Sequence, residues 1–265
     1  MVQALLRRIE RLAKGSSATV GIGRAKRGDA TDLTVKLAAE EGLGQLEVFE
    51  RPEALVRSLV DRRIDAAVRG TLGADEVLHH LRTATGGRSP GRAALIELGG
   101  AGGGAFLLAP VGIDEGTTLA QRWRLLEACA RAVAAMGEEP AVMVMSKGRP
   151  EDGDRARWIA RSLDEARGLV ARAGRAGIRA DVADILVERA LGRCNVLVAP
   201  DGVTGNLTFR LLHYVGGHDA WGALALHLLP SLVYVDTSRD KQDFLGAVKW
   251  ARATASMEPT GDDGA

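Results

Sequence analysis

The stretch CNVLVAPDGVTGNLTFRLLHYVGG, residues 194–217, decides the fold because it places a strand, a turn and a helix in immediate succession. Its first half is a continuous apolar run, which is typical of a strand covered on both faces of a sheet. In its second half, Leu207, Leu211, Tyr214 and Val215 recur at helical spacing, and a glycine pair ends the pattern. Between the two lies a small polar turn with glycines, which either only connects the elements or also holds a ligand.

Apolar runs of this kind alternate with helical patterns along most of the chain. The runs that we expect to form strands are 18–24, 45–50, 65–70, 93–98, 105–113, 141–146, 195–200 and 231–237. The runs at 93–98 and 105–113 are joined by a glycine-rich link and are expected to be antiparallel. The segment WGALALHLLP, residues 221–230, is interpreted as helical. The alternation as a whole predicts an α/β protein with a largely parallel sheet.

Composition narrows the class of protein. The 265 residues allow one large domain or two small ones, and no apolar run approaches the ~20 residues that a membrane helix needs. The net charge of +1 gives no electrostatic reason to expect nucleic acid or an anionic membrane as a partner. Only Cys129 and Cys194 occur, and the histidines lack a common metal spacing, so we expect no disulfide framework, no metal site and a cytoplasmic location.

The ends of the predicted strands carry the candidate ligand-binding residues, because ligands of open α/β sheets gather there. The first such end, GIGRAKRG at 21–28, has neither the dinucleotide-binding spacing nor the lysine of a phosphate-binding P-loop, since Asp29 stands in its place. A plain strand-to-helix turn is therefore favoured here, and a lesser role at the mouth of a site stays open.

At the second end, Arg69 closes a strand, and Gly70 and Thr71 lead toward a helix. An arginine beside the amides of a helix start suits a phosphate or another anion. The alternative is a surface arginine with Thr71 as an ordinary helix cap.

The third end is the turn of the opening stretch. Asp201 or Thr204 can cap the following helix, Gly205 removes side-chain bulk, and Asn206 can both donate and accept hydrogen bonds. These residues are either a helix cap alone or a wall of a ligand site.

At the fourth end, the strand at 231–237 runs into Ser238 and Arg239, which we expect at the N-terminus of the last helix. Backbone amides, a hydroxyl and a guanidinium there would suit a phosphate or a thioester oxygen. Asp243 follows in the expected first turn, either as a general base or as an acidic residue favoured by the helix dipole.

The order of these motifs resembles the phosphate acetyl/butyryl transferase superfamily. The turn PDGVTGN is similar to the Asp-Gly-x-Thr-Gly-Asn motif of the PlsX acyl-phosphate synthases, and VDTSRDKQDFLGAVKWARATA looks like the Ser-Arg…Asp segment of the transferases. Ser238 and Arg239 match the residues that stabilise the carbonyl oxygen there, and Asp243 corresponds to the base for the thiol, although its distance from Ser238 is slightly shorter than in the transferases. Within the superfamily, VRGTLGADEVL and APDGVTGNLTFRLLHYVGG look most like the MtxX proteins, which are methanogenesis marker proteins associated with a methyltransferase system.

The resemblance implies a two-domain fold of the isocitrate/isopropylmalate dehydrogenase type with an interdomain cleft. The first domain would comprise residues 1–113 and 232–265, and the second residues 114–231. It also implies a homodimer and a small phosphate or acyl ligand. No cofactor is expected to be tightly bound, and CoA or a CoA-like thiol would be a substrate.

Two functions of different classes follow. The first is a phosphate acyltransferase that moves an acyl group between phosphate and a thiol. The second is a non-catalytic or regulatory subunit that binds methyltransferase subunits. A dehydrogenase is the weakest alternative, because the sequence has no clustered aspartates for a metal and no dinucleotide motif.

Overall fold

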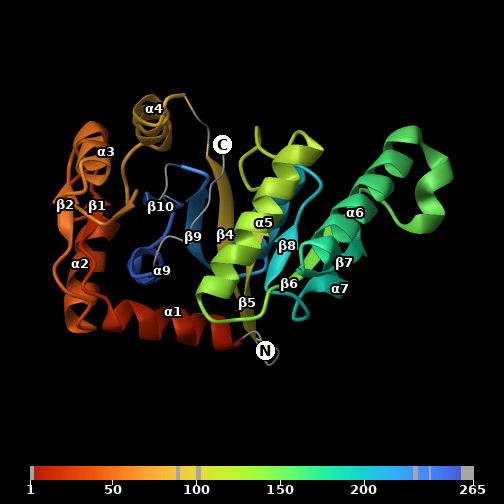
Figure 1. The fold of residues 1–265 in the computed structure, drawn as a ribbon. Helices are drawn as coiled ribbons and strands as arrows, with labels where there is room; N and C mark the ends of the chain where they lie inside the picture. The colour runs from red at the N-terminus through yellow and green to blue at the C-terminus, as the bar shows by residue number, and fades with distance from the viewer. Residues whose placement is uncertain (1–2, 88–89, 100–102, 229–231, 239, 258–265) are drawn as a thin grey trace. The chain divides into compact units, whose positions relative to one another are not determined.

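The computed structural model describes residues 3–87, 90–99, 103–228, 232–238 and 240–257 (Figure 1). The chain divides into two compact units. The middle unit comprises Met1–Leu6 and Gly91–Ala220, and the terminal unit comprises Arg7–Pro90 and Trp221–Ala265. No helix in the described part of the chain is long and apolar enough to cross a membrane.

The terminal unit has a mainly parallel sheet in the order β2-β1-β3-β10-β9. The first four strands are parallel, and β9 is antiparallel to β10. The strands are β1 (Val20–Gly23), β2 (Glu47–Phe49), β3 (Ala66–Val68), β9 (Asp219–Leu226) and β10 (Val233–Asp236). The helices are α1 (Gln3–Gly15), α2 (Ala30–Glu40), α3 (Pro52–Val60), α4 (Ala74–Ala84) and α9 (Leu245–Ala255). The carboxyl ends of β1, β2, β3 and β10 therefore lie at one edge of this sheet.

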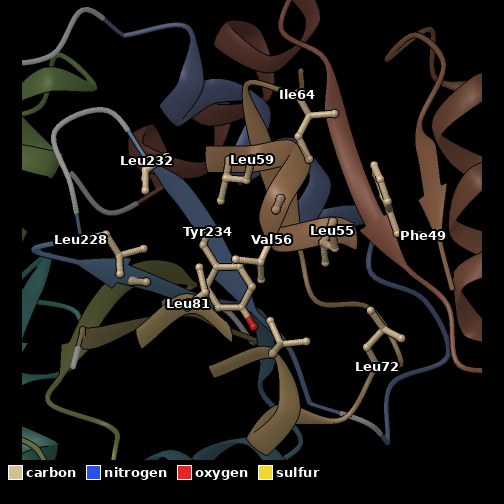
Figure 2. Close-up of a cluster of buried hydrophobic side chains, with 13 residues drawn as sticks. Phe49, Leu55, Val56, Leu59, Ile64, Leu72, Leu81, Leu228, Leu232 and Tyr234 are labelled. Atoms are coloured by element: carbon tan, nitrogen blue, oxygen red, sulfur yellow. The ribbon is translucent and has the colours of Figure 1, made fainter. Parts of the chain in front are cut away.

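One core cluster of the terminal unit forms where α3 and α4 pack against the sheet. Tyr234 of β10 is fully buried and lies among leucine and valine side chains of α3 and α4 (Figure 2). Gly21 of β1 is needed for this packing, because a Cβ atom there would lie 2.5 Å from Ile64 and 2.8 Å from Phe49. Gly21 and Gly23 of GIGRAKRG thus serve close packing of the chain against itself, whereas Gly28 has a φ of +77° and open space around it.

The middle unit has a mixed sheet in the order β4-β5-β8-β6-β7. The pair β4–β5 is antiparallel, as expected, and the pairs β5–β8, β8–β6 and β6–β7 are parallel. The strands are β4 (Gly91–Leu98), β5 (Gly104–Ala109), β6 (Ala141–Met145), β7 (Arg179–Asp184) and β8 (Val196–Val198). The helices are α5 (Leu119–Ala135), α6 (Arg157–Arg175), α7 (Val187–Ala190) and α8 (Gly202–Arg210), with a 3₁₀ turn at Pro150–Arg155 and a π-helical turn at Leu211–Val215.

The prediction of an α/β protein with a largely parallel sheet is confirmed. The unit boundaries differ from the predicted ones, which fell after residues 113 and 231. Residues 91–113 belong to the middle unit because β5 pairs with β8. Residues 221–226 belong to the terminal unit because β9 pairs with β10.

Two expected helices are corrected. The alanines and leucines of segment 221–230 favour a helix, but residues 219–226 form strand β9. Pairing with β10 overrides the weak helix propensity of these residues. The last helix begins at Leu245 rather than at Ser238. Strand β7 was not predicted, because its sequence RADVAD lacks an apolar run, as suits a strand that pairs on one side only.

The helix of the opening stretch forms, but its apolar face is not part of the core. Leu207, Leu211 and Val215 are 56%, 60% and 79% exposed, and Tyr214 is 41% exposed. The helical spacing is right, and the π-helical turn continues α8 in the same direction. The face that the sequence marks as buried is thus an exposed apolar stripe, defined by these four residues.

Candidate functional site

The carboxyl ends of β3 and β10 bring Arg69 next to Asp236. The two strands are parallel, with Val68 opposite Val235. The residues that follow these two, Arg69 and Asp236, therefore lie beside each other. The Nε atom of Arg69 donates to Oδ1 of Asp236 at 2.5 Å, and Nη1 donates to the carbonyl of Leu72 at 2.7 Å. The arginine is 4% exposed. Arg69 is therefore neither a surface residue nor an unpaired cation, because its charge is balanced by a buried carboxylate.

Gly70 continues this strand end in a conformation that only glycine adopts easily. Its φ is +59°, and a Cβ atom would lie 2.0 Å from the carbonyl oxygen of Gly23. Its own carbonyl accepts a hydrogen bond from Oγ1 of Thr237 at 2.8 Å. Thr237 was not singled out in the sequence, although its position directly after a strand was a usable signal. Gly70 and Thr237 thus join the ends of β3 and β10.

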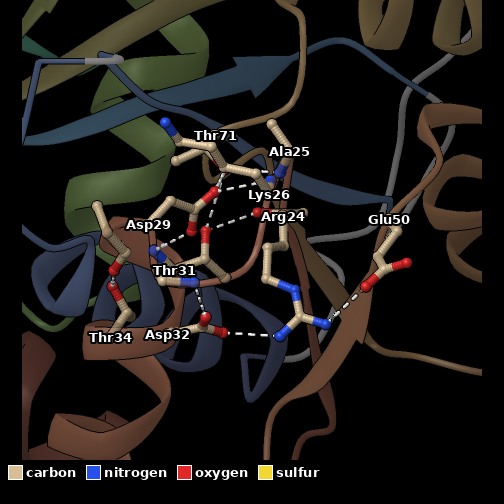
Figure 3. A network of polar contacts seen from close by, with 12 residues as sticks. Arg24, Ala25, Lys26, Asp29, Thr31, Asp32, Thr34, Glu50 and Thr71 are labelled. Carbon is tan, nitrogen blue, oxygen red and sulfur yellow. Dashed lines mark hydrogen bonds and ion pairs between the residues drawn. The ribbon is translucent and has the colours of Figure 1, made fainter.

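Thr71 joins the end of β3 to the loop between β1 and α2 (Figure 3). Its Oγ1 donates to Asp29 and accepts from the amide of Ala25 at 2.8 Å. Thr71 is not the cap of α4, because that helix starts at Ala74 after Gly73. The hydroxyl therefore ties two strand-end loops together instead of capping a helix.

The loop between β1 and α2 satisfies its amides with its own carboxylates (Figure 3). Asp29 accepts from the amide of Thr31 at 2.9 Å and caps α2, and Asp32 accepts from the amide of Gly28 at 2.5 Å. Partial burial opposes ionisation of Asp29, but hydrogen bonds from Thr71 and from nearby amides outweigh it and hold its pKa below the ordinary value. These carboxylates occupy donors that a phosphate-binding loop would offer, which explains why the glycine pattern here is not a nucleotide motif.

Ser238 follows β10 in a loop, and it does not stand at a helix start. Its Oγ accepts from the amide of Asp240 at 3.5 Å. Arg239 lies outside the described residues. Asp243 lies just before α9, and its Oδ1 accepts from the amide of Leu245 at 2.9 Å. The expected helix N-terminus at Ser238 is therefore wrong, whereas Asp243 does lie at the helix start. Arg69 and Ser238 follow parallel neighbouring strands and therefore lie at the same edge of the sheet.

In the middle unit, Asp201 caps α8 and pairs with a lysine. Its Oδ1 accepts from the amide of Thr204 at 2.8 Å, and its Oδ2 lies 2.7 Å from Nζ of Lys147. Partial burial opposes ionisation of Asp201, but the hydrogen bonds from Lys147 and Thr204 outweigh it and lower its pKa. Lys147 was not a candidate in the sequence, where it stands in a polar loop directly after a predicted strand.

The glycine and asparagine of the opening turn contact the chain itself. A Cβ atom on Gly205 would lie 1.9 Å from the carbonyl oxygen of Pro110. Asn206 donates from Nδ2 to the carbonyl of Val111 at 2.9 Å. The space that the sequence assigned to an approaching ligand at Gly205 is filled by the segment after β5. Both residues hold that segment against the first turn of α8.

Comparison with solved structures defines the class of the fold. No family model matches the chain. A branched-chain phosphotransacylase from Enterococcus faecalis V583 has a TM-score of 0.67 and 16% identity, with 91% of this chain and 100% of that chain covered. A phosphotransacetylase from Streptococcus pyogenes has a TM-score of 0.63 and 15% identity, with 95% and 97% covered. A dehydrogenase from Burkholderia xenovorans LB400 shares the fold less closely, with a TM-score of 0.51 and 13% identity over 90% of this chain and 94% of that chain. The chain thus has the α/β fold shared by phosphotransacylases and some dehydrogenases.

Sequence similarity places the chain more narrowly. A protein of Methanosarcina mazei named "Putative methyltransferase mtx subunit X" is 36% identical over 273 residues, which cover 96% of each chain. The chain belongs to the family of these mtx subunit X proteins.

Proposed function

We propose that this protein binds a phosphorylated ligand and transfers an acyl group between phosphate and a thiol such as CoA. The observation that carries the proposal is that Thr71, Thr237 and Ser238 follow the carboxyl ends of the parallel neighbours β3 and β10, with Asp243 in the segment between Ser238 and α9. The fold shared with a branched-chain phosphotransacylase over nearly the whole chain supports it. The isocitrate/isopropylmalate dehydrogenase type of two-domain fold, a homodimer and the absence of a tightly bound cofactor are parts of the same proposal.

The proposed reaction requires hydrogen-bond donors to the carbonyl oxygen and a base for the thiol. The thiol sulfur attacks the carbonyl carbon of an acyl phosphate, the carbonyl oxygen becomes anionic, and the bond to phosphate then breaks. Ser238 and Arg239 are proposed to stabilise the anionic oxygen by hydrogen bonds that strengthen in the transition state. Asp243 is proposed to accept the thiol proton. Its Oδ1 is held by the amide of Leu245, and among the described residues Oδ2 has no hydrogen-bond partner, so this oxygen can take the proton.

The experiment follows thioester formation from acyl phosphates and CoA across short and branched acyl groups. Asp243→Asn keeps an oxygen that can accept from the amide of Leu245 but removes the base, so we expect the turnover number to fall roughly 10²–10⁴-fold. Asp240→Asn removes an exposed carboxylate from the same loop and is expected to keep full activity. Folded wild-type protein that transfers none of these acyl groups would refute the transferase.

The second candidate function is a regulatory subunit of a methyltransferase system linked to methanogenesis. Membership of the mtx subunit X family favours it. The buried pair of Arg69 and Asp236 favours it as well, because the cation predicted to bind phosphate is 4% exposed and donates from two of its nitrogens to protein oxygens. Two results together would support this function over the first. The protein would co-purify with methyltransferase subunits in a stoichiometric complex, and it would show no acyl transfer.

A further inference from the structure

Cations pair with carboxylates at the carboxyl ends of parallel strands in both units, and the pair of Arg69 and Asp236 differs in access from the pair of Lys147 and Asp201. The side chains of Arg69 and Asp236 are 4% and 12% exposed. Those of Lys147 and Asp201 are 41% and 25% exposed. Two of the guanidinium nitrogens of Arg69 are committed to protein oxygens. The lysine pair is therefore the one that a dissolved ligand can reach.

The backbone around Lys147 is held in place on both sides. The amide of Lys147 donates to Oγ of Ser162 at 3.0 Å, and Ser162 is itself buried. The preceding residue, Ser146, donates from its amide to the carbonyl of Asp184 at 2.9 Å and from its hydroxyl to the carbonyl of Gly148 at 2.7 Å. The lysine thus extends from a rigid strand end, although the sequence places it in a polar loop.

The ammonium of Lys147 is also fixed at its far end. It lies 2.7 Å from Oδ2 of Asp201, whose other oxygen is held by the amide of Thr204 in the first turn of α8. An ammonium has three N–H donors, and among the described residues Nζ has no second partner. Two donor directions therefore remain for an external acceptor.

The local charge also favours an anion. Asp201 carries one negative charge, and its pKa lies below the ordinary value, so it stays ionised at neutral pH. It caps α8, whose N-terminus carries roughly half a positive charge. The carboxylate is thus shared between the helix end and Lys147, and the group of three keeps a partial positive charge.

We propose that Lys147 binds a phosphate group in the middle unit. A lysine binds phosphate as a point charge, and the oxygens of a phosphate monoester or an acyl phosphate are the acceptors that match its two remaining donors. The inference rests on the proposed function for the class of ligand. Lys147 is a residue that the motif resemblance does not include.

The test is isothermal titration calorimetry, which measures the Kd of the full chain for inorganic phosphate and for acetyl phosphate. A hydrogen bond to a charged group contributes about 1.5–3 kcal/mol, so Lys147→Met is expected to raise Kd about 10–100-fold. Lys147→Arg keeps the charge and is expected to bind more tightly than Lys147→Met. Lys36→Met removes an exposed lysine of the terminal unit and is the matched control, with an unchanged Kd expected.

The outcomes separate this inference from the proposed function. Phosphate binding to the wild type that is unchanged in Lys147→Met overturns the role of Lys147 and leaves acyl transfer standing. An equal loss of phosphate affinity in Lys147→Met and Lys147→Arg also overturns the role of Lys147. The positive charge would then not be the cause of binding. A wild type that binds neither probe overturns both. A complementary readout is the NMR signal of the Lys147 side chain, which is expected to shift with phosphate and not with equal chloride.

Discussion

Replacing Gly205 by alanine tests whether this glycine serves the protein's own packing or a ligand. In α8, the added methyl carbon would lie 1.9 Å from the carbonyl oxygen of Pro110 and 3.2 Å from the side chain of Ala199. The first contact is far closer than real Cβ atoms tolerate, and its partner is a backbone oxygen that cannot rotate away. Either α8 or the segment after β5 must therefore shift by about 1 Å, against close packing that resists such shifts.

The expected cost follows from two opposing effects. Overpacking of a well-packed site costs about 1–3 kcal/mol, and a backbone partner places this site at the upper end. Alanine also gains about 1 kcal/mol over glycine inside a helix. The net destabilisation is therefore about 2 kcal/mol, which lowers Tm by about 4–8 °C in a protein of this size.

The assay is thermal and urea unfolding of Gly205→Ala beside Gly168→Ala. Gly168 lies inside α6, and a methyl carbon added there would have no other atom within 4 Å, so its replacement is expected to stabilise by about 0.5–1 kcal/mol. A Gly205→Ala protein as stable as Gly168→Ala would refute the packing argument. If Gly205→Ala had unchanged stability but no longer bound phosphate, Gly205 would instead be a residue that contacts the ligand.

Three further predictions concern the cysteines, Asp201 and the exposed apolar stripe. Burial raises the pKa of both Cys129 and Cys194 to about 12, so a disulfide reagent at pH 8 is expected to label neither thiol in the native protein and both in guanidinium; rapid native labelling would contradict this. The lowered pKa of Asp201 means that its contribution to stability is present above its unfolded pKa of about 3.9 and is lost as the pH falls through the lower folded value. The free energy of unfolding is thus expected to fall more steeply below about pH 4 in the wild type than in Asp201→Asn, and parallel curves would argue against the ion pair. Leu211→Glu is expected to leave the free energy of unfolding within about 0.5 kcal/mol, because the side chain is 60% exposed. Light scattering of the wild type at micromolar concentration tests the proposed homodimer, and a monomer would contradict it.

Local features of this protein could be predicted from the sequence because they depend on neighbours along the chain. The strand, turn and helix of 194–217 are present, and Asp201, one of two candidate caps, holds the start of α8. Helix α5 begins after the capping residue Thr118 and ends shortly before Gly137, which has a positive φ, and both residues are local signals in the sequence. In each case a cap, a glycine or an apolar period a few residues long carries the information.

Contacts between distant segments were decided only by the tertiary structure. Arg69 and Asp236 are 167 residues apart, and they pair because β3 and β10 are neighbours in the sheet. No property of Arg69 alone distinguishes such a buried partner of a carboxylate from a ligand-binding cation. The same holds for Gly205, whose missing side chain makes room for the carbonyl of Pro110.

Tertiary structure also decided which of the charged residues at the strand ends is accessible. Lys147 has no motif around it, and its position near Asp201 arises because β6 and β8 are parallel neighbours whose following residues meet at one edge. Sequence patterns report which residues follow a strand, since that depends on local periodicity. Which of them face each other, and which remain open to solvent, depends on the order of strands in the sheet, because that order is set by pairing between segments far apart in the chain.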